Sequence, residues 1–234
     1  MSIKDKLLAQ RIYLLLGALF ITSLVVSNLI FQKFFYWYPL NIEIFGSKLF
    51  EISVGILPYP ITFLITDLVS EIYGKKRAND IVIAGIFASL FSIAIILMAD
   101  YVPAIINSPI NDEVFKLVFS KTVLAVGSSM FAYLLAQLID IRIYHFWKKL
   151  TNGKHLWLRN NFSTWLSQFV DTLFIIGLLC FFEVLPWSSF KGLLISGFLF
   201  KVLVAAFDTP FLYLGVYFFR KRFKLKINEE ISLI

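Results

Sequence analysis

The side chains in this sequence with the chemistry to hold a ligand are polar and ionisable groups set inside long apolar segments. They are Asp67, Glu71, Gln137, Asp140, Gln168, Asp171, Lys201 and Asp208. A charged side chain at the centre of a bilayer costs about 2.5–3.5 kcal/mol on insertion scales, so each of the charged ones requires a reason. We therefore treat this set as the candidate lining of a site.

Helical spacing places these residues on shared faces. Asp67 and Glu71 are separated by four positions, so they lie on one side of a helix. A Q-x-x-D pattern then occurs twice, as Gln137 with Asp140 and as Gln168 with Asp171, on two successive segments. We expect these faces to converge at one depth of a helical bundle.

The kind of ligand follows from the charges. Five acids against the single Lys201 leave an excess that a dry bundle does not tolerate. Some acids must be protonated, solvated, paired with Arg159, or bound to a ligand rich in donors. Carboxylates accept hydrogen bonds and glutamine both donates and accepts, which suits a planar heterocycle such as an amino-pyrimidinone better than a phosphate. The rings of Tyr59, Phe63 or Tyr73 would stack on it.

Each residue also has a structural interpretation, which the sequence leaves open. Glu71 and Asp140 lie near the end of their segments and could reach the membrane surface. Lys201 could serve only as a counter-ion for Asp171 or Asp208, and the glutamines could only tie helices together.

Patterns typical of enzymes do not occur. Gly127-Ser128-Ser129 has no base near it in sequence, because both histidines fall in a loop, and no H-E-x-x-H or G-x-x-x-x-G-K-[ST] motif is present. We expect no catalytic residue, no metal and no cofactor. The single Cys180 cannot form an internal disulfide.

The elements that must position these residues are membrane helices. Of the 234 residues, 59% are hydrophobic and 16% charged, with a mean hydropathy of +0.80. A soluble domain has about 25% charged residues. Six segments approach the roughly 20 apolar residues needed to cross a bilayer. They are 12–31, 52–73, 81–101, 122–141, 163–183 and 190–219. We predict an all-α integral membrane protein, a bundle of six transmembrane helices in one domain, 1–234.

Proline and aromatic residues add two features. Pro58-Tyr59-Pro60 and Asp208-Thr209-Pro210 interrupt two of the segments, as helices around transporter sites often are. The aromatic-rich stretch 34–50 is either an interfacial belt or a cap over the site. The apolar segment after Arg11 is too long for a cleaved signal, so we expect it to be retained.

Basic residues set the orientation. Sixteen of the 22 Lys and Arg residues fall on the side of the predicted bundle that carries both termini. The positive-inside rule therefore predicts that both termini are cytoplasmic. The net charge of +7 is explained by this topology, and we expect no nucleic-acid partner.

These residues resemble a known family, the queuosine precursor transporters of the vitamin uptake group. The resemblance runs from Ser27-Asn28 to Thr209-Pro210. Its clearest segments are Thr66–Gly74, Ala136-Gln137 with Asp140, Arg159-Asn160 with Ser163, Ser167-Gln168 with Asp171-Thr172, and Lys201.

The resemblance implies import of 7-deazaguanine bases (the cyano and aminomethyl forms, or queuine) across a bacterial inner membrane. It also implies a fold similar to the substrate-binding subunits of energy-coupling-factor transporters. The expected substrate-binding residues are Asp67, Glu71, Gln137, Asp140, Asn160, Gln168, Asp171 and Lys201. Asp171 or Asp140 would hold the N–H groups, a glutamine would bind the carbonyl side, and Lys201 would balance charge.

Three alternatives stay open at this point. The chain could be the substrate subunit of a transporter that needs an external ATPase, a purely structural membrane protein, or, least in keeping with the motifs, an intramembrane enzyme. A proton gradient and facilitated diffusion are both open as the driving force.

Overall fold

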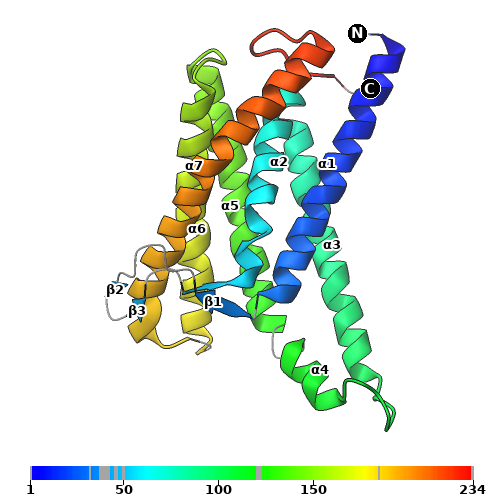
Figure 1. Cartoon of the computed structure of the whole chain (residues 1–234), viewed down its shortest axis with the longest axis vertical. Helices are drawn as coiled ribbons and strands as arrows, with labels where there is room; N and C mark the ends of the chain where they lie inside the picture. The colour runs from blue at the N-terminus through cyan, green and yellow to red at the C-terminus, as the bar shows by residue number, and fades with distance from the viewer. Residues whose placement is uncertain are drawn as a thin grey trace.

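The computed structural model describes residues 2–31, 33–36, 43–44, 47–48, 51–119, 123–183 and 185–232. Long helices form a bundle, with most helix axes within a small angle of one direction (Figure 1). The helices are α1 (Ile3–Ile30), α2 (Tyr59–Ile72), α3 (Lys75–Tyr101), α4 (Asp112–Val118), α5 (Val123–Leu150), α6 (Leu156–Phe181) and α7 (Phe190–Phe223). Two short 3-10 helices are η1 (Val54–Ile56) and η3 (Trp187–Ser189).

Two small antiparallel strand pairs lie between α1 and α2. Strand β1 (Phe34–Tyr36) pairs with β4 (Glu51–Ser53), and β2 (Glu43–Ile44) pairs with β3 (Ser47–Lys48). The predicted aromatic stretch 34–50 falls here. Its positions 37–42, 45–46 and 49–50 are outside the described residues, so both interpretations of that stretch remain predictions.

Within the described residues, five segments are long and apolar enough to cross a membrane. They are Ile3–Ile30, Val54–Ile72, Lys75–Tyr101, Leu156–Phe181 and Trp187–Phe223. The α-helical membrane class is confirmed. Helix α5 runs through the same bundle but is not among these five, so the expected total of six spans stays a prediction.

The second predicted span, 52–73, agrees in extent with Val54–Ile72 but is not one continuous α-helix. Residues 51–53 form β4 and 54–56 form η1, and α2 begins only at Tyr59. Pro60 lies in the first turn, where a missing N–H costs nothing, so these prolines begin the helix and do not interrupt it. Helix α2 has 14 residues and is therefore about 21 Å long, less than the roughly 30 Å of a hydrocarbon core.

The expected break in the last span was also wrong. Helix α7 continues through Pro210 as one helix of 34 residues. The Thr209 hydroxyl donates to the carbonyl of Ala205, at 3.1 Å, in the turn where proline removes a backbone donor. A helix of this length exceeds the bilayer core, and Figure 1 shows α7 tilted across the bundle.

The short helix α2 lies at the centre. Of the apolar window Val54–Ile72, 67% is buried inside the protein, whereas the corresponding fraction for α3 is 22%. The largest helix–helix interface is between α5 and α6, and α2 also contacts α1, α3, α5 and α7. Side chains on α2 therefore face other helices, while α3 presents most of its surface outward.

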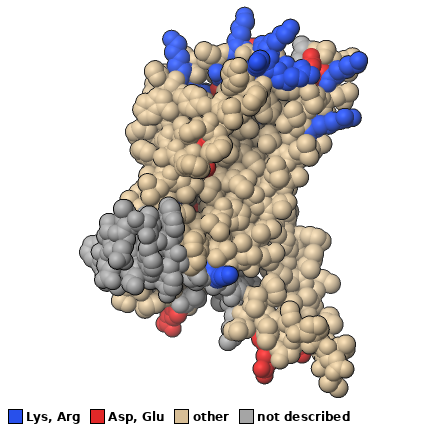
Figure 2. Space-filling view, viewed as in Figure 1, with Lys and Arg blue, Asp and Glu red and all other residues tan. Residues whose placement is uncertain are grey.

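One end of the bundle is strongly basic. Helix α1 begins and α7 ends there, and Figure 2 shows most of the visible Lys and Arg side chains gathered at it. We call it the basic end. The chain after α7 is anchored at this end as well. The Ile231 N–H donates to the Ile72 carbonyl at 2.7 Å, and the Ile231 side chain is buried.

Candidate functional site

Three polar stripes meet inside the bundle. On α2, Tyr59, Phe63, Asp67 and Glu71 recur every fourth residue and are all buried. A matching stripe on α5 and a third on α6 face it. Their buried members are Tyr133, Gln137, Asp140, Tyr144 and Lys148 on α5, and Arg159, Asn160, Ser163, Ser167, Gln168 and Asp171 on α6. The predicted convergence of these faces is what the structure shows.

Asp171 is held by two neighbours. Its carboxylate forms an ion pair with Lys201 of α7, and its Oδ1 accepts from the Tyr59 hydroxyl at 3.1 Å. The Lys201 ammonium also lies 5.1 Å from the centre of the Tyr59 ring. Because both carboxylate oxygens of Asp171 are engaged, the counter-ion interpretation of Lys201 describes this geometry well.

Asp67 and Asp140 form the acidic centre. Both side chains are buried, with the two carboxyl groups near each other, and the Ser167 hydroxyl donates to Asp140 Oδ1 at 3.0 Å. Asp67 Oδ1 and Asp140 Oδ2 have no donor from the described residues.

The two glutamines add further acceptors to this centre. Gln137 Nε2 donates to the Tyr133 hydroxyl at 2.7 Å. The Oε1 atoms of Gln137 and Gln168 have no donor among the described residues, although both side chains are buried. Leaving a buried polar atom unpaired costs about 1–3 kcal/mol, so this concentration of acceptors is expensive unless a donor arrives.

Glu71 has a different environment from the other acids. Arg159 Nη2 and Arg220 Nη2 contact its Oε1 at 2.7 and 2.5 Å, and Lys148 Nζ lies 3.8 Å from its Oε2. The Tyr144 hydroxyl donates to the same Oε2 at 3.1 Å. The Glu71 side chain is 1% exposed, so it points into the protein, and its contacts link α2, α5, α6 and α7.

Arg159 fixes this arrangement to the loop before α6. Its Nη1 donates to the carbonyls of Gly153 and Lys154, both at 2.9 Å. The charge excess noted in the sequence is thus reduced, because Arg159, Arg220 and Lys148 reach Glu71 and Lys201 reaches Asp171. Lys148 and Arg220 come from outside the predicted set. Asp67 and Asp140 keep the excess at the centre.

Some predicted residues lie at the edge of this centre or away from it. Asn160 Nδ2 donates to the Thr209 hydroxyl at 3.3 Å and connects α6 to α7. Asp208 is half-buried beside Gln168 in a small cavity. Tyr73 was one of three rings considered for stacking on the ligand, and the structure places it away from this centre. Its hydroxyl donates to the Ala9 carbonyl, and its ring packs against Tyr13 and Phe219.

An aromatic wall closes one side of the site. The rings of Tyr59 and Tyr133 meet edge to face at 5.0 Å, and Phe63 lies 6.1 Å from Tyr133. Sequence reasoning missed Tyr133, Tyr144 and Lys148. The signal was present, because Tyr133 precedes Gln137 by four positions, and Tyr144 and Lys148 follow Asp140 by four and eight.

The cavity that reaches this site is small. It lies between α2, α6 and α7, is lined by Tyr59, Phe63, Gln168, Lys201 and Asp208 among others, and has a volume of about 20 Å³. Sites for drug-sized ligands measure roughly 300–1,000 Å³. A ligand of that size would fit here only if these helices separated.

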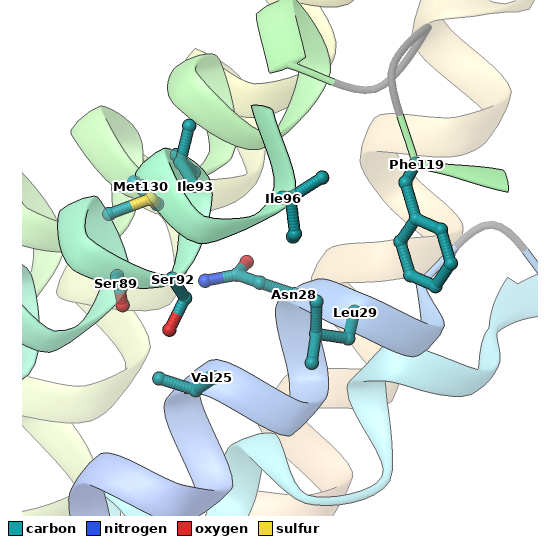
Figure 3. A pocket seen from close by; sticks show the side chains of 9 residues that line it. All are labelled: Val25, Asn28, Leu29, Ser89, Ser92, Ile93, Ile96, Phe119 and Met130. Carbon is teal, nitrogen blue, oxygen red and sulfur yellow. The ribbon is translucent and has the colours of Figure 1, made fainter. Parts of the chain in front are cut away.

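A second small cavity lies between α1, α3 and α5, toward the end remote from the termini. Its volume is about 30 Å³, and Figure 3 shows Asn28 projecting from α1 toward Ser89 and Ser92 of α3. Asn28 Nδ2 and Ser89 Oγ are buried without a partner among the described residues. This polar, water-sized space suits a bridging water better than a substrate. The neighbouring Ser27 hydroxyl donates to the Gly55 carbonyl and holds η1 to α1.

Together, the long apolar helices define a polytopic membrane protein, and this protein has a buried polar centre. Comparison with known sequences identifies the class. Residues 53–215 match the model of the family described as "Putative vitamin uptake transporter", and the chain belongs to that family. This membership in a transporter family confirms that the chain is not an enzyme.

One curated relative has a more specific description than the family. The chain is 27% identical over 174 residues to the "Probable queuosine precursor transporter" of Bacillus subtilis (strain 168), which covers 74% of each chain. No solved structure matches the chain significantly.

Proposed function

We propose that the chain imports 7-deazaguanine bases, the precursors of queuosine, through the site formed by α2, α5, α6 and α7. The observation that carries this proposal is the set of buried acceptors without donors: Asp67 Oδ1, Asp140 Oδ2, Gln137 Oε1 and Gln168 Oε1. The amino-pyrimidinone edge of such a base presents adjacent N–H donors and one carbonyl. A phosphate or carboxylate ligand would instead place its own acceptor oxygens against these acceptor oxygens of the protein.

Within this proposal each residue has a role. Asp67 and Asp140 bind the N–H groups, and the glutamines bind the remaining donor and the carbonyl. The Asp171–Lys201–Tyr59 group forms the charged wall, and the Tyr59 and Tyr133 rings contact the heterocycle. Asn160 acts indirectly through Thr209. Glu71 organises the basic end of the site and does not contact the ligand, since its oxygens are engaged by cations.

We further propose that the bundle spans an inner membrane six times with both termini in the cytoplasm. Figure 2 supports this orientation, because the visible basic side chains concentrate at the end where the chain begins and ends. The site would then open to the cytoplasm past Glu71.

The test is uptake by the purified chain in liposomes free of any ATPase. We expect accumulation of labelled 7-cyano- or 7-aminomethyl-7-deazaguanine, competed by the unlabelled base and not by uracil. Asp140→Asn replaces an acceptor by a donor at the centre and should reduce uptake at least tenfold. Asp80→Asn, an exposed acid on α3, is the matched control and should leave uptake unchanged.

Two results would overturn the proposal. If the folded chain binds no deazaguanine, the substrate assignment is wrong. If it binds the base but moves it only when an ATPase module is added, the chain is a substrate subunit and not a self-sufficient transporter. Repeating the uptake with and without a pH gradient separates proton coupling from facilitated diffusion.

A further inference from the structure

A large cavity at the basic end lies outside the acidic centre, although two of its lining residues, Arg159 and Arg220, also contact Glu71. It lies between the loop that precedes α6 and the last turns of α7, and its volume is about 560 Å³. Six of its lining residues carry the argument: Lys154, Arg159, Tyr213, Tyr217, Arg220 and Lys221.

Positive charge exceeds negative charge around this cavity. Arg159 and Arg220 both contact one oxygen of Glu71, so two guanidinium groups share one carboxylate. Lys148, the third cation near Glu71, is paired at 2.8 Å with Glu230. Within the described part of the chain, Lys154 and Lys221 take part in no ion pair, and both are exposed.

The start of α6 adds to this field. His155 precedes the helix without a side-chain hydrogen bond to its first turn, and the Trp157 N–H donates to the Tyr213 hydroxyl at 3.1 Å. The N-terminus of a long helix carries partial positive charge, which favours an anion nearby. The cavity therefore combines two ammonium groups outside any ion pair of the described residues, of which Lys221 lies over the Tyr217 ring, with a shared pair of guanidinium groups and a helix N-terminus.

Its position is that of a membrane–water interface. Tyr213, Tyr217 and Trp157 are 44%, 57% and 50% exposed on the outer face beside these cations. Tyrosine and tryptophan next to lysine and arginine are the residues that mark the headgroup level of a membrane helix. Farther from the basic end, Phe207 and Phe211 of α7 are exposed and apolar.

We propose that this cavity binds the headgroup of an anionic phospholipid. The phosphate lies between Lys154 and Lys221 and faces the arginine pair, and the acyl chains follow the apolar outer surface of α7. Charge complementarity selects an anionic lipid over a zwitterionic one, because a choline or ethanolamine cation would meet the same lysines. Basic pockets between transmembrane helices are known to bind such headgroups.

The test compares two double variants with equal loss of charge. Lys154→Gln with Lys221→Gln removes the two ammonium groups of the cavity. Lys76→Gln with Lys149→Gln removes two exposed lysines of the same end that do not line it. Each full-length protein is purified in mild detergent, and its melting temperature and native mass spectrum are measured with added phosphatidylglycerol, phosphatidylcholine or inorganic phosphate.

We expect phosphatidylglycerol to bind and stabilise the parent chain and the control more than phosphatidylcholine does. In the cavity variant its affinity should fall about fivefold for each lysine removed. Equal phosphatidylglycerol affinity in both variants would overturn the proposal. Equal stabilisation by inorganic phosphate would also overturn it, since the cavity would then be a site for soluble anions. Neither result bears on deazaguanine uptake.

Discussion

The ion cluster around Glu71 makes the strongest quantitative prediction. In Glu71→Gln the carboxylate is lost while its buried partners remain. Lys148 keeps Glu230 at 2.8 Å, and Arg220, whose side chain is 26% exposed, can turn toward solvent. Arg159 has neither choice, because its side chain is 0% exposed and its other acceptors are neutral. Removing one partner of a buried ion pair costs about 3–5 kcal/mol, and we expect a loss of that size.

The measurement is unfolding of the purified chain in detergent, by heat and by denaturant. Arg222→Gln is the matched control, because it breaks an exposed ion pair with Asp5 at the same end and should change stability little. Combining Glu71→Gln with Arg159→Gln should cost less than the sum of the two single changes. If Glu71→Gln is no more harmful than Arg222→Gln, or if the double change is additive, Glu71 does not organise this cluster.

Three further predictions concern the surrounding framework. Gly74→Ala should destabilise the chain by more than about 1 kcal/mol, because Gly74 has φ +84 and a Cβ there would collide with the Glu230 side chain. If the double variant Gly74→Ala with Glu230→Ala regains stability, the collision is the main cause of the loss. Lys201→Met should reduce both stability and uptake, because it leaves the buried Asp171 carboxylate without its ion-pair partner. Adding Asp171→Leu should restore stability but not uptake. If uptake also recovers, this ion pair is not part of the transport site. In a Cys180→Ser background, Leu68→Cys combined with Gly215→Cys should form a disulfide on oxidation that joins α2 to α7, because a Cβ at position 215 would lie 3.9 Å from Leu68 Cγ. Uptake should stop when the crosslink forms and return when it is reduced. Unchanged uptake with the crosslink formed would show that these helices need not separate.

The sequence specified the helical class and the inward faces, and the reason is physical. Long apolar segments leave the helix as the only spanning form, and a charge inside such a segment must face other protein groups. Helical spacing therefore predicted inward faces for Asp67, Gln137 and Asp140, and all three side chains are buried. The ends of α2 and α7 were harder to predict, because a proline can begin a helix, bend it or be accommodated, and only the neighbouring contacts decide.

Which charged side chains pair with each other in the candidate site could not be predicted from the sequence, for a related reason. Glu71 and Asp67 have the same spacing pattern and nearly the same surroundings in sequence. Even so, three cations reach Glu71, whereas Asp67 lies near the carboxyl group of Asp140. Those cations come from α5, α6 and α7, so the choice depends on tertiary contacts. Tyr133 and Tyr144 escaped notice because tyrosine in a membrane segment is ordinarily interfacial, and only the closed bundle buries them.

Under the proposed function, the order of these groups along the bundle accounts for a site that is both stable and able to release its ligand. The ion pairs of Glu71 hold four helices together near the basic end, and unpaired acceptors follow one turn deeper at Asp67. In this proposal a donor-rich ligand offsets the cost of burying those acceptors. Its binding would then favour a state in which α2 and α7 have separated and the 20 Å³ cavity has widened, since a ligand shifts a conformational equilibrium by its difference in affinity for the two states. An apolar centre of the same shape would be more stable and would have nothing to gain from opening.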